Sequence, residues 1–227
     1  RVLNMCPQFA IVLSGCGVYD GSEIHEAVTT LLALDKAGAG YKCFAPNIPQ
    51  AKTIDHFSGR STALAGDEDN RNVLSESARI ARGDICDLSE FRAADFDGII
   101  FPGGMGAAMN LCNAAEKGPA CDVNEEVRRS IEESYNQGIV IGAMCIAPTI
   151  IARVLGAKGI TVTIGKDKGV AEGIRKMGAR HEDKEAAEVC IDQEHRIVTT
   201  PCYMLAKSIK EVAAGTENLV QAMIDLL

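Results

Sequence analysis

The sequence predicts an α/β protein with a mainly parallel, doubly wound sheet and helices on both faces. Short apolar runs alternate with segments of helical periodicity along most of the chain. Gly or Pro residues end most of these segments. No internal repeat, low-complexity block or linker interrupts the alternation, so we expect one domain over residues 1–227.

The first half of the chain is predicted to contain three buried strands and three helices. Ser22 is the expected cap of the first helix, and Gly38 its stop. Residues 47–70 hold Pro, Gly, Asp and Ser and are expected to form a loop. The predicted strands cover 9–13, 41–45 and 96–101, and the helices cover 22–38, 72–82 and a short stretch after Gly106.

The second half continues the alternation and ends in helix. A charged helix at 124–136 carries Glu125–Arg129 and Arg128–Glu132 at i,i+4 spacing, which is typical of a solvated face. Further elements are expected as strands 138–143 and 160–164, helices from about 147 and over 169–178, a hairpin of 187–191 with 196–200, and one or two closing helices.

Bulk composition excludes several classes of partner. The 227 residues are 24% charged and 47% hydrophobic, and the net charge of -8 argues against a nucleic-acid partner. No apolar run approaches the ~20 residues of a membrane span. The first residues, RVLNMCPQ, are too short and too polar for a signal peptide, so a cytoplasmic location is expected. The chain begins with Arg1 rather than Met, so the alternative is a mitochondrial or other organellar location after removal of a targeting segment.

The nine cysteines do not form a metal-binding or redox motif. Their number is odd and no pair has CxxC spacing; the smallest gap separates Cys112 from Cys121. We therefore expect no metal site, and free thiols in a reducing compartment, most of them buried.

Three glycine-rich turns follow predicted strands: SGCGVYDG (14–21), PGGMG (102–106) and GAMCIAP (142–148). Ligands of doubly wound sheets bind beyond the carboxyl ends of the strands. If the three strands are neighbours, these turns meet at one edge of the sheet and form a site there.

Cys145 lies where the third of these strands passes into a helix. Such a turn can hold the thiol in a strained conformation, as in a nucleophile elbow. The N-terminus of the following helix is expected to lower the pKa of the thiol. The alternative is a buried thiol that only fills space.

A thiolate that attacks a carbonyl also needs oxyanion donors and a proton-transfer group. The backbone N–H of Ile146 and those of Gly103 and Gly104 are the candidate donors. The candidate proton-transfer residues open the first helix at the same edge of the sheet: Glu23, His25 and Glu26.

Two rival functions lack their motifs. In GCGVYDG, Asp20 occupies the third glycine position of a dinucleotide-binding loop, so no such cofactor is expected. A class I amidotransferase needs a late His-x-Glu, which neither His181 nor His195 provides. His195 is expected on a surface hairpin, and His56 and His181 in loops.

Five segments of the chain resemble one known family. They are IVLSGCGVYDGSEIHEA (11–27), RNVLSESARIARG (71–83), FPGGMGAAMNL (101–111), MCIAP (144–148) and IVTTPCYML (197–205). In this order and over nearly the whole chain they are similar to the ES1/ElbB family of the DJ-1/PfpI superfamily.

The resemblance implies a flavodoxin-like three-layer sandwich, an elbow at Cys145 and often a homodimer. It implies that Glu26 partners the cysteine, with Glu23 one turn before it, and that a protonated Glu26 lowers the pKa of the thiol. Bacterial ElbB-like members are described as glyoxalases that convert glyoxal to glycolate without glutathione, which implies a small carbonyl substrate.

The chain departs from the superfamily pattern at two positions. Ile146 follows the cysteine where many members have His, so Glu26 or His25 would have to act as the base. Met105 stands where Phe is common. Three hypotheses follow: a glyoxalase-like enzyme, a redox sensor in which Cys145 is oxidised to a sulfinate, and a scaffold that binds a metabolite without turnover.

Overall fold

The computed structural model describes residues 6–61 and 71–227. Its centre is a seven-stranded sheet in the order β10-β11-β7-β6-β1-β2-β5, parallel except where β10 meets β11. The strands are β1 (Gln8–Val12), β2 (Gly40–Ala45), β5 (Ile85–Asp87), β6 (Gly98–Phe101), β7 (Val140–Met144), β10 (Cys190–Asp192) and β11 (Ile197–Thr200).

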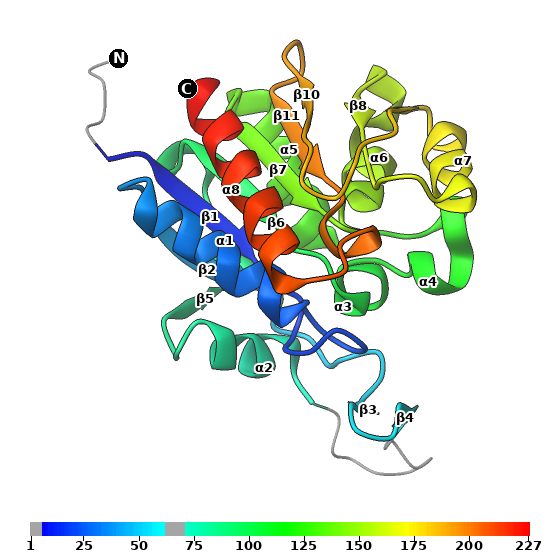
Figure 1. Ribbon diagram of the computed structural model, residues 1–227. Coiled ribbons are helices and arrows are strands. Elements are labelled where there is room, and N and C mark those ends of the chain that lie inside the picture. Colours follow the sequence, from blue (N-terminus) through cyan, green and yellow to red (C-terminus); the bar gives the residue numbers. More distant parts are fainter. Residues whose placement is uncertain (1–5, 62–70) are drawn as a thin grey trace.

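Helices cover both faces of this sheet. On one face α1 (Ile24–Lys36) packs alongside α8 (Ile209–Asp225), with α2 (Val73–Ile80) near the sheet edge (Figure 1). On the other face lie α5 (Glu125–Gln137) and α6 (Pro148–Leu155), followed by α7 (Lys168–Lys176). Two short helices, α3 (Met105–Met109) and α4 (Ala114–Lys117), complete that side. The predicted three-layer, flavodoxin-like α/β fold is thereby confirmed.

The buried strands explain why the apolar runs of the sequence are continuous rather than alternating. Every residue of β6 and β7 is buried, because both faces of a parallel sheet are covered. The predicted strands 9–13, 41–45 and 138–143 are found within a residue or two, and the predicted late hairpin is β10–β11.

The cap of the first helix lies one residue later than predicted. Glu23 is the N-cap, because its Oε2 accepts from the Glu26 N–H at 2.7 Å. Ser22 is fully buried, and its hydroxyl accepts from the Ser14 N–H at 2.8 Å. The predicted cap is therefore wrong: Ser22 ties the preceding loop to the strand instead.

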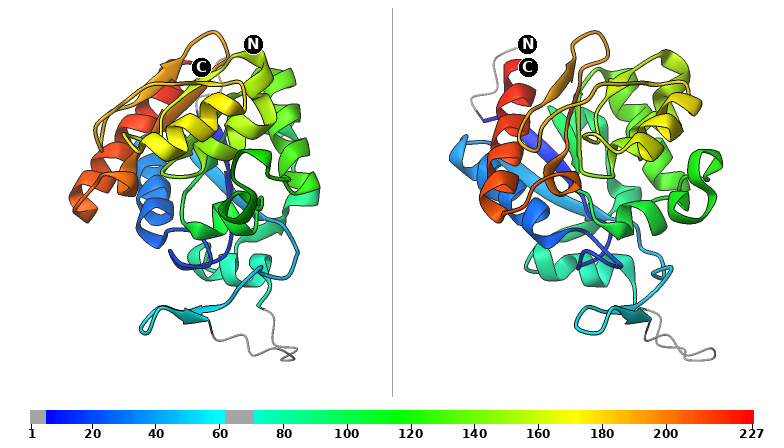
Figure 2. Two further views of the ribbon diagram at one scale, coloured as in Figure 1. Left: turned by 90° about the vertical axis from the view of Figure 1, so that its right-hand side faces the viewer. Right: turned by 45° about the vertical axis from the view of Figure 1, so that its right-hand side comes forward.

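Several short elements were missed or misplaced. Strand β5 was not predicted, because three half-buried residues carry little periodicity. The predicted loop contains β3 (Ile54–Asp55) and β4 (Arg60–Ser61), a hairpin that projects from the body in both views of Figure 2; the rest of that loop, 62–70, lies outside the described residues.

The strand expected at 160–164 lies outside the central sheet. It shortens to β8 (Thr161–Val162) and pairs with β9 (Arg180–His181). The short helix expected after Gly106 starts earlier, at Met105. A single helix, α8, closes the chain.

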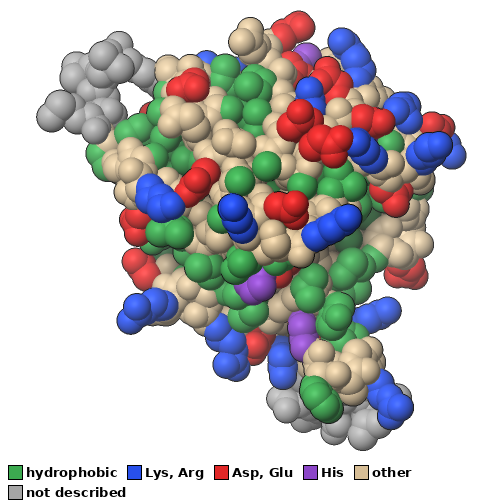
Figure 3. All heavy atoms as spheres, in the orientation of Figure 1, with side chains coloured by type: hydrophobic (Ala, Val, Ile, Leu, Met, Phe, Trp, Pro, Cys, Tyr) green, Lys and Arg blue, Asp and Glu red, His purple; other side chains and the backbone are tan. Residues whose placement is uncertain are grey.

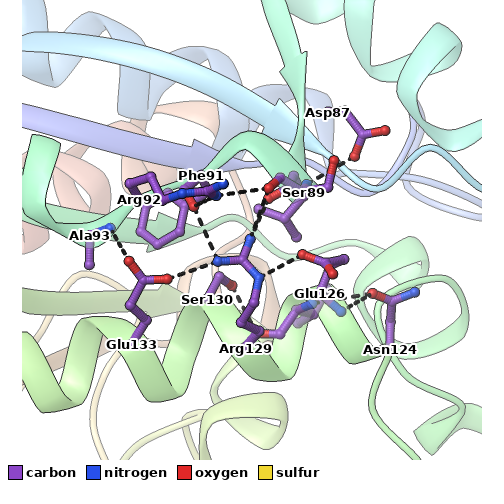
Figure 4. A network of polar contacts seen from close by, with 12 residues as sticks. Asp87, Ser89, Phe91, Arg92, Ala93, Asn124, Glu126, Arg129, Ser130 and Glu133 are labelled. Carbon is purple, nitrogen blue, oxygen red and sulfur yellow. Dashed lines mark hydrogen bonds and ion pairs between the residues drawn. The ribbon is translucent and has the colours of Figure 1, made fainter.

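One charged face is less solvated than predicted (Figure 4). The Arg128–Glu132 pair forms at 3.6 Å, as expected. Arg129 pairs instead with Glu126 at 2.7 Å and with Glu133 at 2.8 Å. Its guanidinium also donates to the backbone carbonyls of Leu88 and Phe91. The expected Glu125–Arg129 pair is replaced because these carbonyls draw Arg129 toward the segment that precedes β6.

No helix among residues 6–61 and 71–227 is long and apolar enough to cross a membrane.

Candidate functional site

The three glycine-rich turns do meet, because β7, β6 and β1 are neighbours in the sheet. Backbone hydrogen bonds connect the first turn and the residue before α1 to the second turn: the Gly106 N–H donates to Gly21 O at 2.9 Å, and the Glu23 N–H donates to Gly103 O at 2.9 Å. The carboxyl edge of the sheet therefore holds one site, built from three turns that lie far apart in the sequence.

Cys145 stands at the centre of this site in a strained conformation. Its φ of 59° lies in the left-handed region that residues other than glycine rarely adopt. Its N–H donates to Thr200 O at 3.0 Å, which holds the turn against β11. The residue is only 8% exposed. This is the conformation expected of a nucleophile elbow.

Glu26 is the acid that faces the thiol. Its carboxyl is fully buried, hydrogen-bonds with the Cys145 thiol, and accepts from two backbone N–H groups, Gly103 on Oε2 at 3.0 Å and Tyr203 on Oε1 at 3.1 Å. Burial raises the pKa of Glu26 from its ordinary 4.5 to about 8, and the charge of Glu23 adds to the rise against the two N–H donors. Glu26 is therefore mostly protonated at neutral pH.

The pKa of Cys145 is raised, which is opposite to the predicted direction. Burial is the larger cause, and negative charge on Glu26 is the next. The backbone N–H groups of Gly104 and Ile146 donate toward the sulfur and act in the lowering direction. The elbow therefore holds a neutral thiol that becomes a nucleophile only when its proton has an acceptor.

Glycine is required at both positions of the turn after β6. A Cβ on Gly103 would lie 2.4 Å from Cys145 Cβ and 2.7 Å from Glu26 Oε2. Gly104 has φ 96°, and a Cβ there would lie 2.4 Å from the backbone of Glu23. Without side chains, this turn can approach both the thiol and the carboxyl closely.

The predicted site residues divide into two groups. The first group surrounds the Cys145 sulfur and consists of Glu26, Gly104 and Ile146. Gly103 lies beside them, but its N–H donates to the Glu26 carboxyl and is therefore not free to bind an oxyanion.

Glu23 and His25 lie around this centre. Glu23 is buried as the cap of α1 and acts on Glu26 by charge. His25 is exposed, and its Nδ1 hydrogen-bonds the Tyr203 hydroxyl at 2.7 Å. A direct role for His25 as base on the thiol gains no support from this contact.

Sequence reasoning missed two residues that follow β11. Tyr203 supplies the N–H on Glu26 and contacts His25. Cys202 is fully buried, has φ 44°, and has its pKa raised by burial and by the charge of Glu26. Both stand in the segment IVTTPCYML, and the position of β11 beside β7 is the signal that would have found them.

The remaining histidines lie away from the thiol. His56 is in the turn between β3 and β4, as expected. His181 is not in a loop but in β9, where its buried Nε2 accepts from the Ile164 N–H at 3.2 Å. His195 is in the β10–β11 turn, but its side chain is only 10% exposed and pairs with Asp192 at 2.9 Å. The described residues contain no group of three or more His, Cys, Asp or Glu side chains that could hold a metal ion.

No family model matches the chain. It is 44% identical over 226 residues to the human glutamine amidotransferase-like class 1 domain-containing protein 3, mitochondrial, covering 96% of this chain and 82% of the human protein. It is 42% identical over 226 residues to the ES1 protein homolog, mitochondrial, of Rattus norvegicus, covering 96% and 83%.

Solved structures agree with these sequence relatives. An isoprenoid biosynthesis protein with an amidotransferase-like domain from Ehrlichia chaffeensis superposes with a TM-score of 0.90 at 36% identity, over 97% of this chain and 99% of that one. Glyoxalase III from Candida albicans superposes with a TM-score of 0.62 at 16% identity, over 95% and 97%, which shows a shared fold alone.

Proposed function

The chain belongs to the ES1 family, whose fold is that of the DJ-1/PfpI superfamily, and from this premise we propose that it is a cysteine-dependent enzyme acting on small dicarbonyls. The proposed reaction is the glutathione-independent conversion of glyoxal to glycolate. The observation that carries it is the strained Cys145 thiol held against a buried carboxyl, Glu26, whose pKa is about 8.

Glu26 first acts as the base. As the sulfur bonds to the aldehyde carbon, the Glu26 carboxylate accepts the thiol proton and then gives it to the former carbonyl oxygen, which yields a hemithioacetal. The N–H groups of Gly104 and Ile146 stabilise negative charge that develops beside the sulfur.

The second half of the reaction moves a proton between the two substrate carbons. Glu26, again a carboxylate, removes the proton from the sulfur-bearing carbon and returns it to the neighbouring carbon. The hydroxyl proton of the sulfur-bearing carbon moves to the oxygen of the neighbouring carbon in the same rearrangement, so that the adduct becomes a thioester of glycolate. Water then cleaves the bond between carbon and sulfur, which releases glycolate and restores the thiol. The net change is the addition of one water molecule to glyoxal, and no cofactor or metal takes part.

Glycolate formation from glyoxal tests the proposal. We expect turnover in the wild type and none in Cys145→Ser at equal concentration. Cys86→Ser is the matched control, because Cys86 lies in β5 at the far edge of the sheet and should retain activity. Absence of turnover in the wild type, or turnover that Cys145→Ser keeps, contradicts the proposal.

A redox sensor is the second candidate, favoured by the N–H groups that face the Cys145 sulfur and would also bind sulfinate oxygens. Mass spectrometry after peroxide treatment should then find oxidation at Cys145 before the other thiols, and Glu26→Gln should alter the oxidation product.

The third hypothesis is a scaffold that binds a metabolite without turnover. It predicts that Cys145→Ser leaves ligand binding intact.

The setting of the protein is also part of the proposal. The human and rat relatives carry the word mitochondrial in their names, which supports a mitochondrial location for this chain.

We further propose a homodimer, with α1 at the interface. Ile24, Val28 and Leu32 form one stripe on α1 and are 41–47% exposed, and Figure 3 shows hydrophobic side chains along this helix. Val28→Glu should shift the mass measured by light scattering from dimer to monomer; an unchanged dimer mass would place the interface elsewhere.

A further inference from the structure

We propose that Cys112 and Cys121 form a second redox site, a buried dithiol that a hydroperoxide converts to an intramolecular disulfide. This site is distinct from the elbow thiol and does not depend on the function proposed above. The two residues are the cysteines closest together in the sequence, but their spacing matches no redox motif, so only the fold shows their contact.

A short antiparallel pairing places the two cysteines on one side of the backbone. Cys112 forms an isolated β-bridge with Val123, and beside it the Asn113 N–H donates to Asp122 O at 3.1 Å. Cys121 has extended backbone angles, so its side chain and that of Val123, two residues on, point to the same side. Cys121 is therefore the diagonal neighbour of Cys112, a position from which side chains across a pairing can touch.

The two thiols hydrogen-bond with each other inside the hydrophobic core. Cys121 is fully buried, Cys112 is 5% exposed, and both belong to one core cluster. The Cys112 thiol also donates to Ala107 O at 3.4 Å, and its sulfur accepts from the Ala114 N–H. The Cys121 carbonyl accepts from Arg153 Nε at 2.7 Å. Both cysteines are thus fixed by their own contacts, and their sulfur atoms already lie side by side in the reduced protein.

A second pair of cysteines shows that closeness in the fold does not by itself bring thiols together. Cys43 and Cys86 lie on the adjacent strands β2 and β5, where Cys43 is opposite Ile85 and Cys86 is opposite Phe44. Successive residues of a strand point to opposite faces, so these two thiols are on opposite sides of the sheet. They accordingly pack against different core clusters. This pair is an internal control for the proposed disulfide.

The segment that covers the dithiol is exposed. None of the residues 113–120, which connect the two cysteines and include α4, is buried. Local opening of such a segment can admit a small oxidant. Burial raises the pKa of Cys112 to about 12, so little of its thiolate is present near neutral pH. Formation of the disulfide should therefore be slow at neutral pH and faster in alkaline solution.

One molecule of hydrogen peroxide suffices for each disulfide. The thiolate of one cysteine attacks a peroxide oxygen, the O–O bond breaks, hydroxide leaves, and the sulfur becomes a sulfenic acid. The thiolate of the other cysteine attacks that sulfur, the S–S bond forms, and a second hydroxide leaves. The two thiol protons convert both hydroxides to water. Each cysteine sulfur loses one electron, and the peroxide gains two.

Peptide mapping of the peroxide-treated protein tests the proposal. Folded Cys145→Ser, which lacks the elbow thiol, is treated with hydrogen peroxide, and the remaining thiols are then blocked with N-ethylmaleimide in urea. Trypsin cleaves after Lys117, so Cys112 and Cys121 fall in different peptides, 93–117 and 118–128. We expect these peptides to be joined, lighter than their sum by two hydrogen atoms, and to separate on reduction with dithiothreitol. The joined product should form faster at about pH 9 than at about pH 7.

Two controls define the result. The wild type should give the same joined peptides, and Cys121→Ser should give none. The peptides that contain Cys43 and Cys86 should stay separate under the same treatment. Absence of the joined peptides, or joining of the Cys43 and Cys86 peptides to the same extent, would overturn the inference.

Urea unfolding of the oxidised protein shows whether the disulfide fits the folded state, and it needs no substitution at either cysteine. Closure of a loop this short should shift the unfolding equilibrium toward the folded state by about tenfold to a hundredfold, and dithiothreitol should remove the shift. An unchanged equilibrium, or a shift toward the unfolded state, would mean that the native contact must break before the bond can form, and would equally overturn the inference.

Discussion

The stability of the Glu26→Gln variant relative to the wild type should increase as pH rises. The carboxyl of Glu26 is fully buried, and its pKa is about 8 against an ordinary value of 4.5. Between these two values the folded state keeps a proton that the unfolded state has lost. The free energy of unfolding of the wild type must then fall as pH rises through this interval. A neutral Gln has no such dependence.

The size of the effect follows from the pKa difference. From 4.5 to about 8, each pH unit costs about 1.4 kcal/mol, so ionising Glu26 costs on the order of 5 kcal/mol by the upper end of the interval. Gln brings a separate, pH-independent cost, because its NH2 group must face one of the two backbone donors, Gly103 or Tyr203. The test therefore uses the change with pH of the difference in unfolding free energy between the two proteins, and not the constant part of that difference.

Urea unfolding of both proteins at a series of pH values measures this slope. The other titrating groups are common to the two proteins, so their contributions cancel in the difference between the two free energies of unfolding. We expect the advantage of Glu26→Gln to be constant below about pH 4.5, to grow by about 1.4 kcal/mol per unit up to about pH 8, and then to level. A difference that stays constant over this interval, or one that shrinks with pH, would refute the burial of an uncharged carboxyl beside Cys145.

Three further predictions concern activity and packing. Because the mechanism needs the Glu26 carboxylate, kcat/KM for glyoxal should rise with pH and level above about 8; a flat profile speaks against Glu26 as base. Glu23→Gln should move that midpoint to lower pH, because the charge of Glu23 raises the pKa of Glu26; an unmoved midpoint contradicts this coupling. Arg129→Met should cost about 2 kcal/mol in urea unfolding, since the half-buried guanidinium bonds two carboxylates and three carbonyls, whereas Arg128→Met, at a surface pair, should cost under about 0.5 kcal/mol; equal losses would contradict the difference in burial.

Much of the candidate site could be predicted because its parts are local. The strand-to-helix joint at Cys145, the PGG turn and the acidic start of the first helix each have a sequence pattern of their own. The rule that parallel strands carry ligands at their carboxyl ends then brings these patterns together. Tyr203 escaped prediction because it contacts Glu26 through a backbone N–H, which any residue other than proline would supply at that position.

The direction of the Cys145 pKa could not be predicted from the sequence either. A helix N-terminus lowers the pKa of a thiol, and that much is visible in the order of residues. Burial and the carboxylate charge of Glu26 oppose it, and both depend on how tightly the turns close around the sulfur.

Among the three candidate proton-transfer residues at the start of the first helix, only the family resemblance indicated Glu26. By itself, the sequence determined the class of fold, the order of most strands and helices, and the candidate thiol at a strand-to-helix joint. These properties follow from periodicity and from residues close together along the chain. Only the tertiary structure decided that β5 completes the sheet edge, that β8 leaves it, that Ser22 is not the cap of α1, and that Glu26 keeps its proton near neutral pH. Each of these depends on desolvation or on contacts between distant segments, and free energies of that kind arise only once the chain has packed.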